Sequence, residues 1–211
     1  MMSKKKTTVF DGLISDNTVL SSLMVISPVI VCANSVQNAA ALIYAFSAIT
    51  FISVLIGSFV PKKLPYAAKT VIYAIISSIV YIPVKTAAQE FFPEVVTRVG
   101  IYFPLLAVNS LIVLQPQTKF RSMKRTQMIP ALVFYILGFD AVILVTAFLR
   151  ELFASGTIAG RVVDMDTLVS GLGMPFGGFI FLGLLCGLYR AVRSAVRREN
   201  REEADSDVHS S

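Results

Sequence analysis

Residues 39–60 read AAALIYAFSAITFISVLIGSFV, and this run ends at Pro61-Lys62-Lys63. No charged side chain interrupts it. A helix needs about 20 apolar residues to cross the roughly 30 Å of hydrocarbon in a bilayer. Further apolar segments lie at about residues 19–32, 66–88, 100–114, 128–153 and 168–192. The sequence therefore predicts an all-α membrane protein with six transmembrane segments.

The composition indicates that lipid surrounds much of this chain. Of its 211 residues, 55% are hydrophobic and 15% are charged, against about 25% charged residues in soluble domains. The mean hydropathy is +0.72. The net charge of +6 comes from short basic clusters between apolar runs. Such clusters are typical of loops beside an anionic lipid surface and argue against nucleic-acid binding.

Lysine and arginine are distributed unevenly between the two sides of the membrane. With the N-terminus inside, 15 of the 19 fall in cytoplasmic segments. The exceptions are Lys85, Arg98, Arg150 and Arg161. The positive-inside rule thus predicts that both termini are cytoplasmic. We divide the chain into a cytoplasmic N-terminal segment (1–18), a membrane domain (19–192) and a polar, basic, disordered cytoplasmic tail (193–211).

The first and fourth segments are too short to span a membrane alone, and they share a motif. In each, a proline is followed by a short apolar stretch and then Asn-Ser. The two motifs are Ser27-Pro28 through Asn34-Ser35, and Phe103-Pro104 through Asn109-Ser110.

Each motif opens a set of three segments, at about residues 19–88 and 100–192. Because three is an odd number, the second set would enter the membrane from the opposite side. Short, interrupted helices at matching places in two inverted repeats point to a midplane site. The alternative is that the prolines simply kink two spanning helices, which membrane segments tolerate.

Five polar residues lie in or beside apolar segments and are candidates for an ion path or for structural roles. Asp140 could be an ion or proton relay, or a hydrogen-bonded structural group. Arg150 and Glu151 could form an outer gate or interface pair, or could snorkel to the headgroups beside a local charge pair. Asn34 and Asn109 could satisfy backbone groups freed at helix breaks, or could line a site.

No motif indicates a self-contained enzyme, and no catalytic residue is predicted. The chain has no nucleotide-binding motif and no nucleophile elbow. Its two cysteines, Cys32 and Cys186, lie in apolar segments, away from the single histidine, His209. They are better explained as small buried residues than as metal ligands.

Four stretches give the chain a family resemblance. They are Ser27-Pro28 through Asn34-Ser35, Phe103-Pro104 through Asn109-Ser110, Leu149-Arg150-Glu151-Leu152 through Ser155-Gly156-Thr157, and Met174-Pro175-Phe176-Gly177-Gly178-Phe179. Over about residues 15–192 the chain resembles the paired six-helix membrane subunits of the Rnf and Na+-translocating NADH:quinone oxidoreductase (Nqr) complexes. The Lys/Arg distribution favours the N-inside member, which is the E-type Rnf or D-type Nqr protein. The resemblance also implies the inverted repeat.

The resemblance implies a [2Fe–2S] cluster that two partner subunits hold with two cysteines each. The matching positions in this chain are Ser27 and Ser110. A serine hydroxyl is not deprotonated near neutral pH, and thiolates suit iron far better than alcohols. We therefore expect that this chain does not ligate a cluster in the family's manner, and that it binds no cofactor alone.

The resemblance finally implies a place in an ion-translocating electron transport complex of the bacterial cytoplasmic (inner) membrane. Such a complex would pass electrons between ferredoxin and NAD and couple this to Na+ or H+ movement. This non-catalytic chain would supply scaffold and part of the electron or ion path. Its partners would be other Rnf/Nqr-type subunits, especially the opposite-orientation paralogous six-helix subunit, and lipid. The alternative is a small-solute or ion transporter-like protein of the same fold without a redox role, which the paired serines keep open.

Overall fold

The computed structural model describes residues 32–61, 63–109, 112, 125–163 and 169–209. This part of the chain is all-α apart from one short hairpin. The α-helices are α2 (Val36–Gly57), α3 (Tyr66–Phe91), α4 (Pro93–Val99), α5 (Tyr102–Leu105), α7 (Arg125–Ser155) and α8 (Pro175–His209). Two 3-10 turns, η2 (Leu106–Val108) and η4 (Ser170–Gly173), and the antiparallel strands β1 (Thr157–Ile158) and β2 (Arg161–Val162) complete it.

Among the described residues, four helices are long and apolar enough to cross a membrane. They are Val36–Gly57, Tyr66–Phe91, Thr126–Ser155 and Pro175–Ala195. At 1.5 Å per residue, α2 alone is about 33 Å long, which matches the hydrocarbon thickness. These four correspond to the second, third, fifth and sixth predicted segments. The first predicted segment lies, except for Cys32, outside the described residues.

The fourth predicted segment, residues 100–114, is not one long helix where it is described. Its helical pieces are α5 and η2, which follow α4. Gly100 separates α4 from α5 with a φ of +53°, a value that glycine adopts at little cost. Asn109 ends η2 in an extended conformation. This agrees with the prediction of a short or broken segment at this place.

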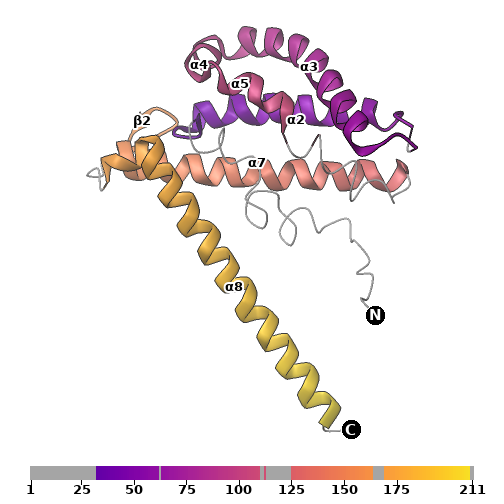
Figure 1. Ribbon diagram of the computed structural model, residues 1–211. Coiled ribbons are helices and arrows are strands. Elements are labelled where there is room, and N and C mark those ends of the chain that lie inside the picture. The colour runs from indigo at the N-terminus through magenta and orange to yellow at the C-terminus, as the bar shows by residue number, and fades with distance from the viewer. Residues whose placement is uncertain (1–31, 62, 110–111, 113–124, 164–168, 210–211) are drawn as a thin grey trace.

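Helix α2 is the centre of the fold and lies between α3 and α7 (Figure 1). It carries no charged residue, so it can be covered by apolar neighbours on both sides. Helices α2 and α7 are antiparallel, because the first residue of α2 bonds Glu151 near the end of α7 while Ser47 bonds Asp140 near the middle of both.

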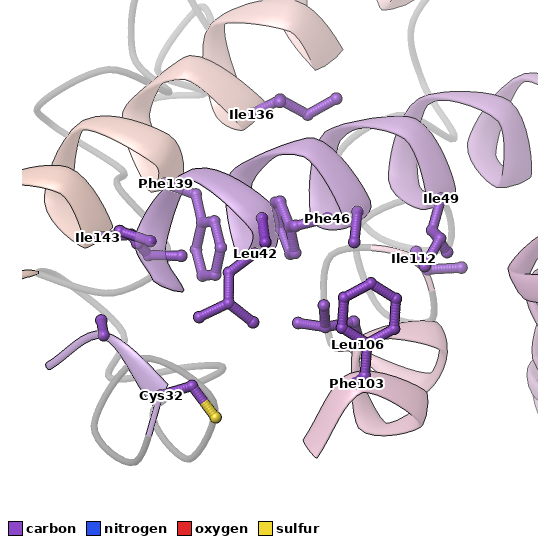
Figure 2. Packing of buried hydrophobic residues seen from close by; sticks show 14 of the residues in the cluster. Cys32, Leu42, Phe46, Ile49, Phe103, Leu106, Ile112, Ile136, Phe139 and Ile143 are labelled. Carbon is purple, nitrogen blue, oxygen red and sulfur yellow. The ribbon is translucent and has the colours of Figure 1, made fainter. Parts of the chain in front are cut away.

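Aromatic stacking joins α2 to α7 in the core (Figure 2). The rings of Phe46 and Phe139 are stacked with centroids 3.6 Å apart, and both residues are fully buried. On α2, the small residues Ala41 and Ala45 are also fully buried. Small side chains allow membrane helices to approach closely, where packing rather than hydrophobicity favours association.

Helix α8 differs from the sequence-based prediction at both ends. It begins at Pro175 rather than near residue 168, and η4 precedes it. Proline suits the first turn of a helix, where its missing N–H costs nothing. At the other end α8 continues to His209, into the range 193–211 that the sequence analysis assigns to a polar cytoplasmic tail. Residues 196–204 read VRRENREEA, and Arg, Glu and Ala are strong helix formers.

The outward surfaces of the membrane helices are apolar. Helix α8 runs away from the α2–α7 pair (Figure 1). Exposed apolar side chains recur at helical spacing on α3 and on α8. They include Val71, Ile75, Ile79 and Ile82 on α3, and Ile180, Leu184 and Leu188 on α8. A soluble protein rarely exposes such patches, whereas lipid or a neighbouring membrane helix covers them naturally.

We predict that Phe139→Ala lowers the free energy of unfolding by about 3 kcal/mol, because it removes the stacked ring and leaves a cavity. Ile79→Ala on the outer face of α3 is the matched control and should change stability little. Thermal unfolding of the purified chain in detergent or lipid measures both. Equal losses for the two variants would mean that the α2–α7 contact is not the centre of the core.

Candidate functional site

The Arg150 guanidinium binds backbone carbonyls at two places where the helical structure is interrupted. Arg150 is fully buried near the C-terminal end of α7. Its Nε donates to the Leu172 carbonyl oxygen at 2.9 Å, and its Nη1 to that of Ala33 at 3.0 Å. Its Nη2 donates to the carbonyls of Gly173 (3.4 Å) and Met174 (3.3 Å). One side chain thus joins the stretch before α2 to the junction of η4 and α8.

Two glycines make room for this contact. A Cβ at Gly178 would lie 2.9 Å from Cζ of Arg150, and a Cβ at Gly177 would meet the Gly171 carbonyl oxygen. Larger residues would therefore push α8 away from α7 and from η4. This explains in physical terms why a Gly-Gly pair follows Pro175-Phe176.

The Glu151 carboxylate binds backbone amides at the same end of α7. It is 4% exposed. Its Oε2 accepts from the backbone N–H of Val36 at 2.7 Å, and its Oε1 accepts from the N–H of Gly160 at 2.9 Å and from the Thr157 hydroxyl at 3.1 Å. Val36 opens α2, where N–H groups lack partners within the helix and a negative charge is stabilising.

The hairpin that Glu151 holds turns tightly. Ala159 and Gly160 between β1 and β2 have φ values of 52° and 79°. Positive φ at both central residues defines the type I′ turn that suits two-residue hairpins. The Leu-Arg-Glu-Leu through Ser-Gly-Thr element is thus one structural unit, in which Glu151 fixes the hairpin that follows α7.

Arg150 and Glu151 are both buried, and neither side chain extends along the surface of the described chain. Burial of these two charged side chains is possible because the interrupted helices at this end leave backbone groups that need hydrogen bonds away from water. We call these two side chains and the backbone groups that they bind the helix-end junction.

A second polar contact lies within the α2–α7 interface. Ser47 Oγ donates to Asp140 Oδ2 at 2.7 Å. The other carboxyl oxygen, Oδ1, is buried without a hydrogen-bond partner in the described part of the chain. The hydroxyls of Ser53 and Thr146, on the same two helices, are also buried without a described partner. In the described part of the chain, Asp140 thus bonds to Ser47 and to none of the predicted site residues.

Asn109 lies at the end of η2, and Asn34 lies in the turn before α2. Asn109, 4% exposed, donates from Nδ2 to the Leu106 carbonyl at 2.6 Å and to Thr50 Oγ1 at 3.3 Å, and its Oδ1 accepts from the Ile112 N–H at 3.0 Å. Its amide thus satisfies backbone groups freed at the break. Asn34 is partly buried and accepts a 2.7 Å hydrogen bond from Asn38 Nδ2.

The thiols do not form a metal site in the described residues. Cys32 and Cys186 are buried and form no disulfide, and no group of three or more His, Cys, Asp or Glu side chains gathers in the described residues. Ser27 and Ser110, which the sequence resemblance implies as cluster-ligand positions, lie outside the described residues.

The sequence analysis missed the partners of the predicted residues. Ser47 and Thr50 are three residues apart in an uncharged run. This spacing places both hydroxyls on one face of a helix and could have predicted a polar face there. The N-cap Ser35, whose Oγ accepts from the Asn38 N–H at 3.3 Å, also marks the start of α2. The sequence does not predict the contact between Glu151 and Gly160, because a hydrogen bond to a backbone N–H requires no particular residue type.

These features define a multi-pass membrane protein with buried polar contacts between its spans. Residues 5–186 match the family described as "Rnf-Nqr subunit, membrane protein", so the chain belongs to the Rnf-Nqr membrane-subunit family. This confirms the resemblance that the sequence motifs suggested.

Curated relatives match along most of their length. The D-type subunit of the Na(+)-translocating NADH-quinone reductase of Chlamydia pneumoniae is 28% identical over 76% of each chain. The E-type subunit of the ion-translocating oxidoreductase complex of Vibrio parahaemolyticus is 24% identical over 96% of this chain and 95% of its own. The D-type reductase protein of Pseudoalteromonas translucida is 22% identical over 89% of this chain and 93% of its own.

We predict that Glu151→Ala destabilises the protein by about 3 kcal/mol, because it leaves two backbone N–H groups and one hydroxyl without the charged acceptor that they share. Glu151→Gln should restore part of this loss, since its amide oxygen can still accept. Glu94→Ala, which removes an exposed carboxylate in the first turn of α4, is the control. Thermal unfolding and the yield of folded protein are the measurements, and a loss in Glu94→Ala as large as that in Glu151→Ala would contradict the assigned role.

Proposed function

We propose that this chain is a membrane subunit of an Rnf-like ion-translocating electron transport complex linked to ferredoxin and NAD. In that complex it supplies scaffold and part of the ion path. The observation that carries the proposal is the family match over residues 5–186, together with relatives named as D-type and E-type members of such complexes over most of both chains. Nothing in the described geometry suggests a catalytic centre of its own.

The proposal assigns this chain to the ion path rather than the electron path. Serine at positions 27 and 110 replaces both thiolates that the family resemblance implies, and a [2Fe–2S] centre needs four suitable ligands. In contrast, the α2–α7 interface contains a carboxylate in the middle of two spans. Charged groups in such positions commonly mark ion or proton pathways.

The proposal includes a three-plus-three inverted repeat and a defined orientation. Helices α2 and α7 hold matching places in the two halves and run antiparallel, and the helical structure is broken around Pro104, where the shared motif stands. Both observations support the repeat. The Lys/Arg distribution supports cytoplasmic termini in a bacterial inner membrane, which puts the helix-end junction on the outer side.

The partners in this proposal are the other subunits of the complex. The opposite-orientation paralogous six-helix subunit is the foremost of them. Exposed apolar side chains along α8, including Ile180, Leu184 and Leu188, support contacts with lipid or with such a protein. The helix-end junction holds the start of α8 firmly to α7, so α8 can present this surface in a fixed direction.

Purification of the tagged chain from its native membrane tests the proposal directly. We expect a stable complex that contains a related six-helix subunit of opposite orientation, with flavin-bearing and ferredoxin-like subunits. A tagged, unrelated inner-membrane protein of similar size is the control for nonspecific association. Recovery of the chain alone, with solute uptake by vesicles that contain only this chain, would support the transporter-like alternative instead.

We also predict that the chain and its six-helix partner, isolated together without oxygen, hold no [2Fe–2S] cluster in the family's manner. The reason is that alcohols do not replace two thiolates at iron. The Ser27→Cys/Ser110→Cys double variant should gain iron and a [2Fe–2S] absorption spectrum, and each single variant should gain much less. Stoichiometric iron in the unmodified pair that is lost on Ser27→Ala or Ser110→Ala would show that the serines are ligands.

A further inference from the structure

One carboxylate stands in an otherwise uncharged interface. Helix α2 carries no Asp, Glu, Lys, Arg or His, and Asp140 is the only such residue of α7 between Thr126 and Leu149. The next charged groups along α7, Arg150 and Glu151, bind the backbone groups of the helix-end junction.

Apart from Arg125 at the start of α7, the other titratable side chains of the two helices are tyrosines. Tyr44 on α2 packs its ring against Phe91 and Phe92 at the end of α3, and Tyr135 on α7 is buried. Besides α2, the described elements that pack most extensively against α7 are η4 and β1, and neither contains a charged residue. Asp140 therefore faces no charged side chain from α2, η4 or β1.

The surroundings of Asp140 suit the binding of a proton better than the binding of a metal cation. Its Oδ2 accepts from Ser47 Oγ at 2.7 Å, and its Oδ1 is buried without a described partner. The adjacent residue, Phe139, stacks on Phe46 and makes this place apolar. An alkali cation that leaves water needs a shell of several oxygens, whereas in the described part of the chain Ser47 is the one side chain bonded to the carboxyl.

Ser47 suits a group that changes its protonation state. A serine hydroxyl can both donate and accept a hydrogen bond. It donates to the ionised carboxylate, and it can accept from the carboxylic acid when the proton resides on Oδ2. The pair can thus hold either state by rotation of one hydroxyl, without movement of α2 or α7.

Two further orphaned hydroxyls lie along the same pair of helices. Thr146 is six residues beyond Asp140 toward the C-terminal end of α7, and Ser53 is six residues beyond Ser47 toward the C-terminal end of α2. Because the helices are antiparallel, the two hydroxyls lie in opposite directions from Asp140, each about 9 Å along the axis. They are 1% and 0% exposed and have no hydrogen-bond partner in the described residues. Buried hydroxyls in such positions are commonly satisfied by internal water.

We propose that Asp140 is a proton-exchange site in the α2–α7 interface, with Ser47 as its hydrogen-bond partner and with water at Thr146 and Ser53 as its connection to the two membrane surfaces. The site takes up a proton from one side and releases it to the other. Its role in coupled ion movement rests on the proposed function, whereas proton exchange itself is a property of this chain alone.

Infrared difference spectroscopy of the full chain in lipid vesicles tests the site. We expect a carboxylic-acid C=O band that titrates reversibly with external pH and shifts in D2O. Asp140→Asn should remove this band, and Ser47→Ala should shift it because the hydrogen bond is lost. Glu90→Gln, which changes an exposed carboxylate at the end of α3, should leave the band as it is. Asp140→Glu keeps a carboxyl and should show a displaced band even if Asp140→Asn folds poorly.

Three results would overturn the proposal. They are the same spectrum in the wild type and Asp140→Asn at every pH, a band that does not exchange in D2O, and a band that Na+ removes at constant pH while K+ does not. The last result would assign the site to Na+.

Ion translocation by the native complex is a separate measurement. Loss of translocation in Asp140→Asn, with assembly intact, supports the coupled role. A titrating band in a wild-type chain that forms no translocating complex would refute the proposed function and leave the proton site standing.

Discussion

The whole structure depends on one constraint, which is that a backbone group in the hydrocarbon cannot be satisfied by water. An unbroken helix meets this constraint by itself, but this chain breaks its helices in several places. At several of the described breaks a side chain supplies the hydrogen bonds that the helix no longer makes. Arg150 donates hydrogen bonds to carbonyls before α2 and around η4, and Glu151 accepts one from the first N–H of α2. Asn109 donates to one backbone carbonyl and accepts from one backbone N–H. These three side chains thus join parts of the fold that the apolar core packs together.

The sequence predicted the long spans well because length and hydropathy are sums over many residues. Helices α2, α3 and α7 lie within about three residues of their predicted ranges. The ends of α8 were mispredicted because they depend on single local features. Pro175 in the first turn and the Arg/Glu-rich stretch after residue 195 are both present in the sequence. A segment defined by hydropathy alone takes no account of either.

The candidate site was predicted in its residues and missed in its contacts. Asn109, Asp140, Arg150 and Glu151 all stand out as polar groups in apolar surroundings, and the structure buries or partly buries each of them. Their partners lie far away in sequence, as Ser47 does from Asp140, or are backbone atoms. Only the antiparallel alignment of α2 with α7 brings the pairs together, and no pattern in a single sequence records that alignment.

The uncharged character of α2 has a consequence for biosynthesis. An Asp at the centre of a span opposes insertion by about 2.5–3.5 kcal/mol, whereas each Leu, Ile, Phe or Val favours it by about 0.3–0.6 kcal/mol. Between residues 129 and 149, α7 carries 13 such residues, enough to offset Asp140. Helix α2 leaves the ribosome first and has no such cost. When α7 enters the membrane, Ser47 is therefore already in the bilayer, and the carboxyl group finds its hydroxyl partner there.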